Sequence, residues 1–530
     1  MESAPDLRDK LKSLSPDLSS WDRTHFGNVR QEIQRLNREL QELRKIPNRS
    51  RPMHAELKII ERLTELYHRE EMLWRQRARL EWLMHGDKKN TYFFHLRASR
   101  RRRKNQIKAL QKPDGELTEN VVEMETMATS FYQHLYTLEG VHNMEQVVDT
   151  VLVIGTQAMN DMPNAPYSQE EVKTALFQMF PVKAPGPGGY PTHFFQHHWE
   201  ICGDDVTKVV LKIVDGTKSV ECINETMLVL IRKVKNPTLL SQFRPISLCN
   251  VLYKIASKVI SNRFKVVLPD IISEEQSAFV PGRLITDNII TAYECLHFMK
   301  RSKAKKNQSC ALKLDMMKAY DRVEWSYLKA IMLKLGFTES WVNIVMGMVT
   351  TVEFAIMFNG KKVSSFKPSR GIRQGDLISP DLFWLAAEGL SCLLKSKSES
   401  SNLHGLQVAP TAPPVNHLQF ADDTLLFFKA NGVGANEVYH VLDTYCQATG
   451  QHINYSKSSV YFSKGVPDTV RQEIKDILNV PNETLNEKYL GMSSDIGNSK
   501  NGAFKYLKDR LWSKVQGWIE STLSSAARKC

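Results

Sequence analysis

The sequence has few cysteines for its length, and they are widely scattered. Eight cysteines occur among 530 residues, no two of them form a Cys-x-x-Cys pair, and no histidines cluster at zinc-binding spacing. Zinc sites and redox centres need such groupings, and disulfide frameworks belong to short secreted chains, so these classes are excluded. The cysteines are therefore expected to be reduced, buried thiols of an intracellular protein.

Long hydrophobic runs are also lacking. No stretch is long enough to span a bilayer, and the polar N-terminus has no apolar core of the kind a signal peptide carries. We therefore expect a soluble protein with no membrane partner, located in the nucleus, the cytoplasm or both. The hydrophobic content of 42% is nevertheless sufficient for a large core and for two or three structural units.

Positive charge is in excess. The chain has 71 lysines and arginines against 58 acidic residues, a formal net charge of +13, which suits a polyanionic partner such as nucleic acid. The densest cluster spans 97–104 and predicts either a nucleic-acid contact or a nuclear-import signal. The predicted nucleic-acid-binding residues of this cluster are Arg100, Arg101, Arg102, Arg103 and Lys104.

Two adjacent carboxylates, Asp422 and Asp423, lie between short apolar segments in 418–428. The flanking Phe, Leu and Thr residues favour strands, and the small Ala421 with two aspartates indicates a tight turn. Paired carboxylates repel each other unless a cation neutralises them, and hard oxygen ligands suit Mg²⁺. A solvated hairpin turn is the alternative for this motif taken alone.

A second carboxylate, Asp315, follows the short apolar stretch 311–314, and a helical pattern begins soon after it. A carboxylate at a strand end can meet the hairpin carboxylates across a sheet. Three such groups around two cations would form a phosphoryl-transfer site. The alternative is a helix N-cap, for which Asp is a favoured residue.

A third motif, in 369–383, sets Arg373 and Gln374 between two glycines, Gly371 and Gly375. The glycines would let the backbone approach a ligand closely and place a cation and an amide beside it. Ser379 followed by Pro380 predicts a helix with Ser as N-cap. An ordinary loop-to-helix junction would explain the Ser-Pro pair but not the Arg-Gln pair.

Together, these motifs resemble those of reverse transcriptases, and in particular those of plant LINE-type non-LTR retrotransposons. The resemblance extends from about Trp21 to the C-terminus. Other segments that carry it are 82–95, 183–187, 243–250, 276–283, 450–458 and 488–491.

The resemblance implies an α+β right-hand polymerase, with fingers, a palm built on an antiparallel sheet, and helices. It implies an RNA-directed DNA polymerase that uses Mg²⁺, with Mn²⁺ as an alternative, and whose partners are an RNA template, a DNA primer and dNTPs. A maturase-like RNA-binding protein and an inactive relic of an element remain the alternatives. Intact Asp315, Asp422 and Asp423 favour the enzyme, because binding alone does not need them.

The resemblance also implies roles for individual residues. Asp315, Asp422 and Asp423 would be catalytic metal ligands, and Lys457 would give a proton to pyrophosphate. Tyr320 would be the aromatic gate that excludes a ribose 2′-hydroxyl, with core packing as the alternative. The remaining predicted substrate-binding residues, which would contact the template base, the nucleotide or its triphosphate, are Gln374, Gly375, Arg373, Arg244 and Arg283.

The sequence departs from the family pattern at several positions outside the three aspartates. Leu377 stands where Pro is usual, Gly188 replaces a usual Asp, Arg232 interrupts a Leu-Ile-Pro-Lys pattern, and Ser493-Ser494 replaces a Pro-containing pair. These changes are typical of drift in an element copy, so ancestry is better supported than activity.

The domain organisation follows from periodicity and from the resemblance. A helical, basic region is expected at 1–140, with apolar stripes through Val29–Leu43 and again through Leu57, Ile60, Leu63, Leu66 and Trp74, which predict a helical hairpin. A linker is expected at 141–166, fingers and palm at 167–495, and the start of a truncated thumb at 496–530. The endonuclease of full-length elements would have to come from a missing domain or another protein.

Overall fold

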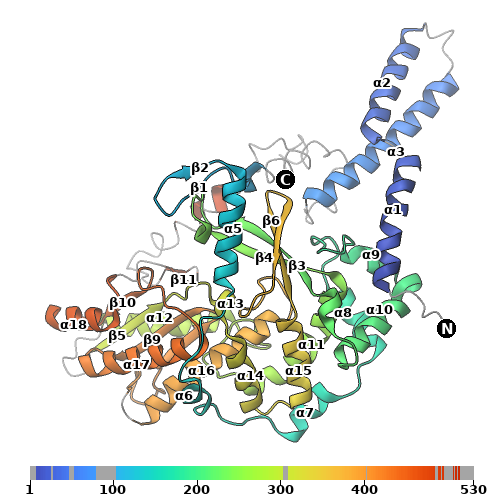
Figure 1. Ribbon diagram of the computed structural model, residues 1–530. Helices are drawn as coiled ribbons and strands as arrows, with labels where there is room; N and C mark the ends of the chain where they lie inside the picture. The colour runs from blue at the N-terminus through green and yellow to red at the C-terminus, as the bar shows by residue number, and fades with distance from the viewer. Residues whose placement is uncertain are drawn as a thin grey trace.

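The computed structural model describes residues 7–25, 28–46, 53–78, 103–301, 308–400, 403–483, 488–490, 492–493, 505, 508–509 and 511–513. Within these ranges the chain mixes helices and sheets behind a helical N-terminal region, in agreement with the expected α+β class (Figure 1). Every helix in this part of the chain is too short or too polar to cross a membrane. The seven cysteines found there carry free thiols, and three of them are buried.

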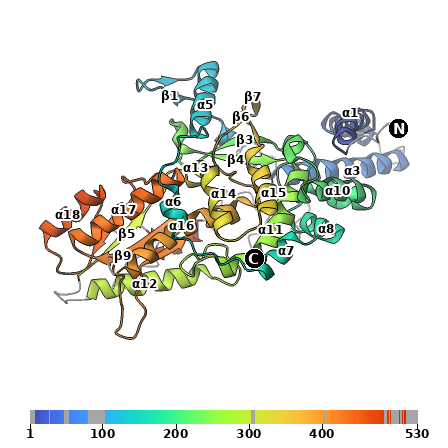
Figure 2. The same ribbon diagram turned by 60° about the horizontal axis from the view of Figure 1, so that its bottom comes forward.

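One four-stranded antiparallel sheet has β5 (Ser309–Leu314) as an inner strand, in the order β10-β5-β9-β8. Side chains of β5 alternate between the two faces of the sheet, so Leu312 belongs to the main core and Ala311 to a smaller cluster with α12. Figure 2 shows α12 along one face and α17 along the other. The other elements of this layer are β8 (His417–Phe420), β9 (Asp423–Lys429), β10 (Ser459–Phe462), α12 (Ile285–Arg301) and α17 (Gly432–Thr449).

A second four-stranded sheet has the order β4-β3-β6-β7. Its β3–β6 pair is parallel, and its other pairs are antiparallel. Alternate residues such as Leu228, Phe354 and Ile356 are buried with Tyr132 of α5 and with Tyr136, the residue that follows this helix. The elements are α5 (Val121–Leu135), β3 (Glu225–Arg232), β4 (Phe243–Cys249), β6 (Glu353–Phe358) and β7 (Lys361–Phe366).

Helices fill the space around the two sheets and form the largest core. The long apolar helix α11 (Val251–Ile271) begins at Asn250, whose side-chain oxygen accepts from the N–H of Leu252. The helix predicted after Ser379-Pro380 is α16 (Ser379–Glu399), although Ile378 rather than Ser379 is its N-cap. The other members are α8 (Gln169–Gln178), α9 (Thr192–His197), α10 (Trp199–Val214), α13 (Ala319–Arg322), α14 (Trp325–Lys334), α15 (Glu339–Thr350) and α18 (Asp468–Leu478).

The N-terminal helices include the predicted hairpin, formed by α2 (Val29–Lys45) and α3 (Met53–Ala78), which projects away from the body in Figure 1. Ile33, Leu36 and Leu40 pack against α3 as expected. The predicted face of α3 was wrong in part, because Leu57 and Ile60 are exposed and Ile59 takes their place beside Leu63 and Leu66. An additional helix, α1 (Leu7–His25), precedes the hairpin and packs against α10.

The segment expected to be a linker is partly helical and packed. It contains α6 (Met144–Val148) and α7 (Gln157–Asn164), and Val147 and Val151 are buried in the main core. Short pairs and turns complete the described elements: β1 (Leu110–Gln111), β2 (Leu117–Thr118), η3 (Val220–Ile223), η4 (Leu240–Gln242), β11 (Lys488–Tyr489) and β12 (Met492–Ser493). Most of the predicted thumb segment 496–530 lies outside the described residues.

Candidate active site

The adjacent aspartates lie in the turn between β8 and β9, so the predicted hairpin is confirmed. Phe420 pairs with Asp423, which leaves Ala421 and Asp422 as a two-residue connection. Ala421 has a φ of 57°, the left-handed backbone that such tight hairpin turns require. Asp422 at the tip is exposed to solvent, whereas Asp423 is half-buried at the start of β9.

A buried glutamine holds this turn in place. Gln276 is 1% exposed. Its Oε1 accepts hydrogen bonds from the backbone N–H groups of Ala421 (3.0 Å) and Ala278 (3.1 Å), and its Nε2 donates to the carbonyl of Ala421 at 3.5 Å. Both backbone groups of Ala421 therefore bond to one side chain, which fixes the direction in which Asp422 points.

Asp315 reaches the same edge of the sheet from β5. Leu314 pairs with Thr424, so the next residues along each strand, Asp315 and Asp423, lie opposite each other. The Asn454 side chain donates to Asp315 Oδ2 at 2.9 Å, and its backbone N–H donates to the Asp315 carbonyl at 2.8 Å. The Asp315 carboxylate is thus oriented before any ligand arrives.

The three carboxylates act on one another electrostatically. Desolvation by the surrounding protein raises the pKa of Asp422, and repulsion from Asp315 raises it further. Desolvation also raises the pKa of Asp423, followed by repulsion from Asp422 and Asp315. The exposure of Asp422 shows that water reaches its carboxylate, so its repulsion is partly screened. A bound cation would relieve what remains.

The donor set fits a hard divalent cation such as Mg²⁺. The described residues contain no group of three His, Cys, Asp or Glu side chains that forms a metal cage by itself. Mg²⁺ does not need one, because it usually binds one or two protein carboxylates together with substrate phosphates and water. Asp315, Asp422 and Asp423 offer only oxygen atoms and face solvent in part. Their role as metal ligands remains a prediction.

Cationic side chains face these carboxylates from the neighbouring sheet. Lys233 follows β3 and Arg244 lies in β4, and both are exposed. Desolvation lowers the pKa of Lys233, while Asp321, Arg244, Lys457 and Asp315 all act on it through their charges. Arg244 and Lys233 also oppose the rise in the pKa of Asp422. The predicted Arg244 is therefore close to Asp422, and the predicted Lys457 is close to Lys233.

Tyr320 lies beside the hairpin. Its ring stacks on Phe383 with centroids 4.7 Å apart and planes 10° apart. Burial raises the pKa of the Tyr320 hydroxyl, and the charge of Asp422 raises it further, which shows that the two groups are close. The ring is thus half-buried and close to the predicted metal site. Its packing on Phe383 is observed, and its role as a gate stays a prediction.

Gln374 connects two parts of the site. Its backbone carbonyl accepts from the N–H of Ser247 in β4 at 2.8 Å, and its Nε2 donates to Asp321 Oδ1 at 3.1 Å. Gly375 is exposed with a φ of 106°, a conformation that favours glycine. Gly371, by contrast, packs against the protein itself, since a Cβ there would lie 2.6 Å from the carbonyl oxygen of Asp321.

Comparisons with known proteins agree with this geometry. Residues 231–494 match the family described as reverse transcriptase (RNA-dependent DNA polymerase). An uncharacterized 149 kDa protein of transposon TX1 from Xenopus laevis is 30% identical over 440 residues, which are 82% of this chain and 33% of that protein. A retrovirus-related Pol polyprotein of a type-1 R2 retrotransposable element from Popillia japonica is 26% identical over 237 residues, 44% of this chain and 31% of that protein.

The chain contains a reverse transcriptase domain of the non-LTR retrotransposon type. This reverse transcriptase domain includes β4, β5, both strands of the aspartate hairpin and the Gln374 loop. The chain spans about a third of the length of the TX1 and R2 relatives.

Arg373 of the reverse transcriptase domain is not placed where a nucleotide could reach it. It is 3% exposed and forms an ion pair with Asp376 at 2.9 Å. Its guanidinium also donates to Asn224 Oδ1 (2.5 Å), to the Met348 carbonyl (2.9 Å) and to the hydroxyl of Tyr253. Arg373 therefore bonds inside the protein instead of making the predicted substrate contact, and it anchors the loop that carries Gln374.

Arg283 also uses its donors inside the reverse transcriptase domain. Its guanidinium donates to four backbone carbonyls near the end of α11, at distances of 2.5 to 3.2 Å: those of Ser273, Gln276, Pro269 and Ile272. These bonds satisfy carbonyls that a helix end leaves without partners. Arg283 is thus a cap of α11 that also supports Gln276, and the structure does not bring it to the predicted triphosphate.

The predicted basic cluster is described only in part. Arg100, Arg101 and Arg102 lie outside the described residues, whereas Arg103 and Lys104 are exposed just before Ile107. Nothing in their surroundings assigns them a ligand, so their predicted contact with nucleic acid stays a prediction.

Sequence reasoning missed three residues that shape the reverse transcriptase site: Gln276, Lys233 and Asp321. Asp321 is fully buried and accepts from the hydroxyl of Tyr136 at 2.8 Å as well as from Gln374. Burial raises its pKa to about 6, against the opposing charge of Lys318. Gln276 begins the segment 276–283 that carried the resemblance, Asp321 follows Asp315 by six residues, and Lys233 belongs to the stretch that departs from the family pattern. A polar residue at such a position was the available signal.

Proposed function

We propose that this chain is an RNA-directed DNA polymerase that extends a DNA primer on an RNA template. In this proposal the β10-β5-β9-β8 sheet is the palm and the β4-β3-β6-β7 sheet belongs to the fingers. The observation that carries it is the meeting of Asp315, Asp422 and Asp423 at one sheet edge, opposite Lys233 and Arg244 of the other sheet.

The reaction joins the primer 3′-oxygen to the α-phosphorus of a dNTP and breaks the bond between that phosphorus and the bridging oxygen of pyrophosphate. Bound to Asp315, Asp422 and Asp423, Mg²⁺ or Mn²⁺ would supply Lewis-acid activation of the 3′-hydroxyl and charge neutralisation at the leaving group. Asn454 orients the Asp315 carboxylate by a direct hydrogen bond, and Gln276 orients the turn that carries Asp422 by bonding to the backbone of Ala421.

The cations of the second sheet suit the triphosphate. Arg244 presents a guanidinium fork that matches phosphate oxygens, and Lys233 adds a second positive charge beside it. Lys457, exposed next to the start of β10, would give its proton to the departing pyrophosphate. These three side chains thus bind and neutralise the polyphosphate, while the carboxylates organise the attacking end.

Nucleotide selection would rest on Tyr320 and Gln374. The Tyr320 ring is held by its stack on Phe383, so it cannot easily move away from an extra 2′-hydroxyl. Asp321 can only accept hydrogen bonds while ionised, which turns the Nε2 of Gln374 toward it and leaves Gln374 Oε1 for the template base or the nucleotide.

The experiment is primer extension on an RNA template with dNTPs and Mg²⁺ or Mn²⁺. The test protein is Asp422→Asn/Asp423→Asn, and the matched control is Asp443→Asn, an exposed aspartate on α17 bonded to Gln447. Extension by wild type and control but not by the hairpin variant supports the proposal. No extension by wild type, with RNA bound equally by all three proteins, would overturn the enzyme and favour a maturase-like binding protein or an inactive relic.

The finer resemblance, to plant elements, is part of this proposal. An uncharacterized mitochondrial protein of Arabidopsis thaliana is 47% identical over 73 residues, which are 13% of this chain and 60% of that protein. A stretch this similar supports a plant relationship for the segment concerned.

A further inference from the structure

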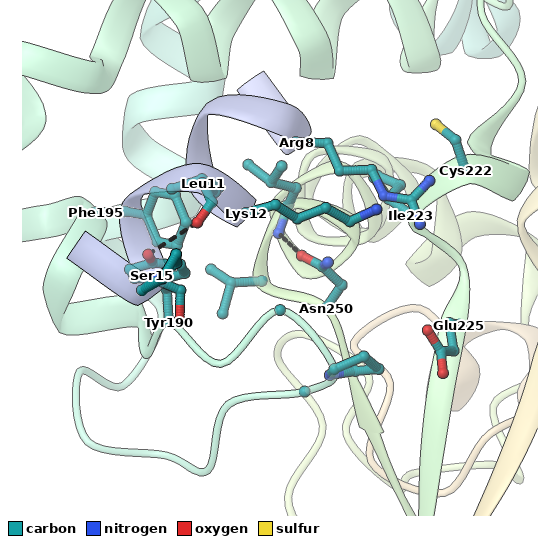
Figure 3. Close-up of a pocket in the computed structure, with 16 residues that line it drawn as sticks. Arg8, Leu11, Lys12, Ser15, Tyr190, Phe195, Cys222, Ile223, Glu225 and Asn250 are labelled. Atoms are coloured by element: carbon teal, nitrogen blue, oxygen red, sulfur yellow. Dashed lines mark hydrogen bonds between the residues drawn. The ribbon is translucent and has the colours of Figure 1, made fainter. Parts of the chain in front are cut away.

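A cavity outside the candidate active site lies between α1 and the main body. Its volume is about 370 Å³, and its walls come from α1, the loop 186–190, η3 and the start of α11 (Figure 3). The hydroxyl of Tyr190 donates to the Leu11 carbonyl at 3.0 Å, and Lys10 pairs with Asp205 at 2.7 Å. These contacts attach α1 to the body and so create the cavity.

Two cations of α1 line this cavity without an acidic partner. Arg8 and Lys12 are four residues apart, so they lie on one face of the helix, and Figure 3 shows both side chains extending across the cavity. Within the described residues, neither forms an ion pair. The carboxylate in the wall, Glu225, is already paired with Lys362 at 2.8 Å. The net charge available to a ligand in the cavity is therefore positive.

The opposite wall is a close-packed glycine loop. A Cβ on Gly186 would lie 2.3 Å from the carbonyl oxygen of Cys249, so only glycine lets the loop come this near to the end of β4. Lys254 adds a hydrogen bond to the Ala184 carbonyl at 3.5 Å. Gly188 adds no side chain and no charge to the wall, which leaves room for a ligand beside Arg8 and Lys12.

The cavity is connected to the candidate active site by one strand. β4 passes Arg244 near the aspartates, then Ser247 beside Gln374, and ends at Cys249 where the cavity begins. Six residue steps from Arg244 to Asn250 correspond to ~20 Å at ~3.4 Å per residue. A single strand with ~3.4 Å between stacked nucleotides would cover that path with about six nucleotides.

We propose that the Arg8–Lys12 cavity binds phosphates of the single-stranded RNA template before it enters the active site. The inference rests on the proposed function for the direction of the template. Single-stranded RNA is favoured over a duplex because the cavity has the size of one or two nucleotides. Its apolar wall residues, such as Pro187 and Ile223, offer a surface for a sugar or base.

The first test measures affinity for primer–template with a 5′ RNA overhang of about 2 or about 12 nucleotides, the longer one exceeding the ~20 Å path. No metal or dNTP is added, so binding is read without catalysis. Arg8→Gln/Lys12→Gln is compared with Arg23→Gln/Lys58→Gln, which removes the same charge from exposed positions of α1 and α3 outside the cavity. Losing two single-strand phosphate contacts should reduce the slope of log affinity against log salt concentration by ~1.4. Binding of the long overhang should become about 25-fold weaker at ~0.1 M salt.

The second test uses the wild-type protein and the thiol of Cys222, which lines the cavity. Alkylation is followed residue by residue by mass spectrometry. Long-overhang RNA should slow the alkylation of Cys222, whereas Cys202 on α10, which is partly exposed outside the cavity, should be unaffected. This readout needs no variant, so it stays valid if α1 detaches after substitution.

The outcomes separate this inference from the proposed function. Weaker binding confined to the long overhang, with protection of Cys222, supports the cavity even if primer extension fails. Equal affinities of both double variants for both overhangs, or unprotected Cys222, would overturn it even for an active polymerase, and the two cations would then serve another polyanion such as an acidic peptide.

Discussion

The buried Asp321 gives a prediction whose size can be worked out. The side chain is 0% exposed, and burial raises its pKa from 3.8 to about 6, opposed by Lys318 and Lys233. Its Oδ1 accepts from Tyr136 and Gln374, while its Oδ2 has no hydrogen-bond partner. Asp321→Asn keeps the shape of the side chain and removes its titration.

The sign follows from the raised pKa. The folded protein binds this proton more tightly than the unfolded chain, so ionisation of Asp321 costs nothing below pH ~4 and progressively destabilises the fold as the pH rises through ~6. A rise of this pKa from 3.8 to about 6 corresponds to roughly 3 kcal/mol when fully developed, with about half of it present at pH ~5. Between pH ~5 and ~8 the variant should therefore gain roughly 1 kcal/mol of unfolding free energy relative to the wild type.

Thermal denaturation of both proteins across this pH range tests the prediction. A gain of roughly 1 kcal/mol corresponds to roughly 3 °C in the melting-temperature difference for a unit of this size. Asp443→Asn, at an exposed position, should show no such trend. A difference between Asp321→Asn and wild type that stays constant from pH ~5 to ~8 would refute the reasoning, because the carboxylate would then have an ordinary pKa.

Further predictions concern the residues around the carboxylates. Gln276→Ala leaves the buried N–H of Ala278 and the partly buried N–H of Ala421 without acceptors, at up to ~1–3 kcal/mol each. The melting temperature and the extension rate should both fall, and both should fall less in Gln276→Glu. Equal losses for the two variants would contradict the acceptor role. Asn454→Ala should raise the Mg²⁺ concentration for half-maximal extension by about 10- to 100-fold, since Asp315 loses its orienting bond, and an unchanged metal titration would count against this. Tyr320→Val should reduce the preference for dNTPs over rNTPs, measured as a ratio of kcat/KM values, by roughly 10- to 200-fold, and an unchanged ratio would leave Tyr320 as core packing.

Local patterns were sufficient for the parts of the site that form within one strand or turn. The hairpin was predictable because strand-forming residues flank a turn-forming Ala-Asp pair, and the hairpin is confirmed as β8 and β9. The strand before Asp315 was predictable from its apolar run and is β5. The stripe of α2 followed from its helical spacing, and Ile33, Leu36 and Leu40 are buried.

Properties that depend on distant partners could not be read from local sequence. Arg283 and Arg244 look alike in the sequence, yet Arg283 donates to backbone carbonyls near the end of α11, and Arg244 is exposed near Asp422. Whether Arg373 points outward depends on Asn224 and Tyr253, more than a hundred residues away. An arginine between two glycines therefore indicates a loop that can come close to a partner. It does not show whether that partner is a ligand or a buried side chain such as the amide of Asn224.

The position of Gln374 explains why the site depends on such distant contacts. The carboxylates of the site lie at the edge of one sheet, whereas its cations come from the other sheet, Lys233 directly after β3 and Arg244 within β4. The two sheets must therefore be held in a fixed relation for both sets of charges to face one substrate. Gln374 touches both halves, through Ser247 in β4 and through Asp321 on α13. Loosening the Asp321–Gln374 bond should therefore weaken nucleotide binding and slow the chemical step together, whereas loss of Arg244 alone should act mainly on binding.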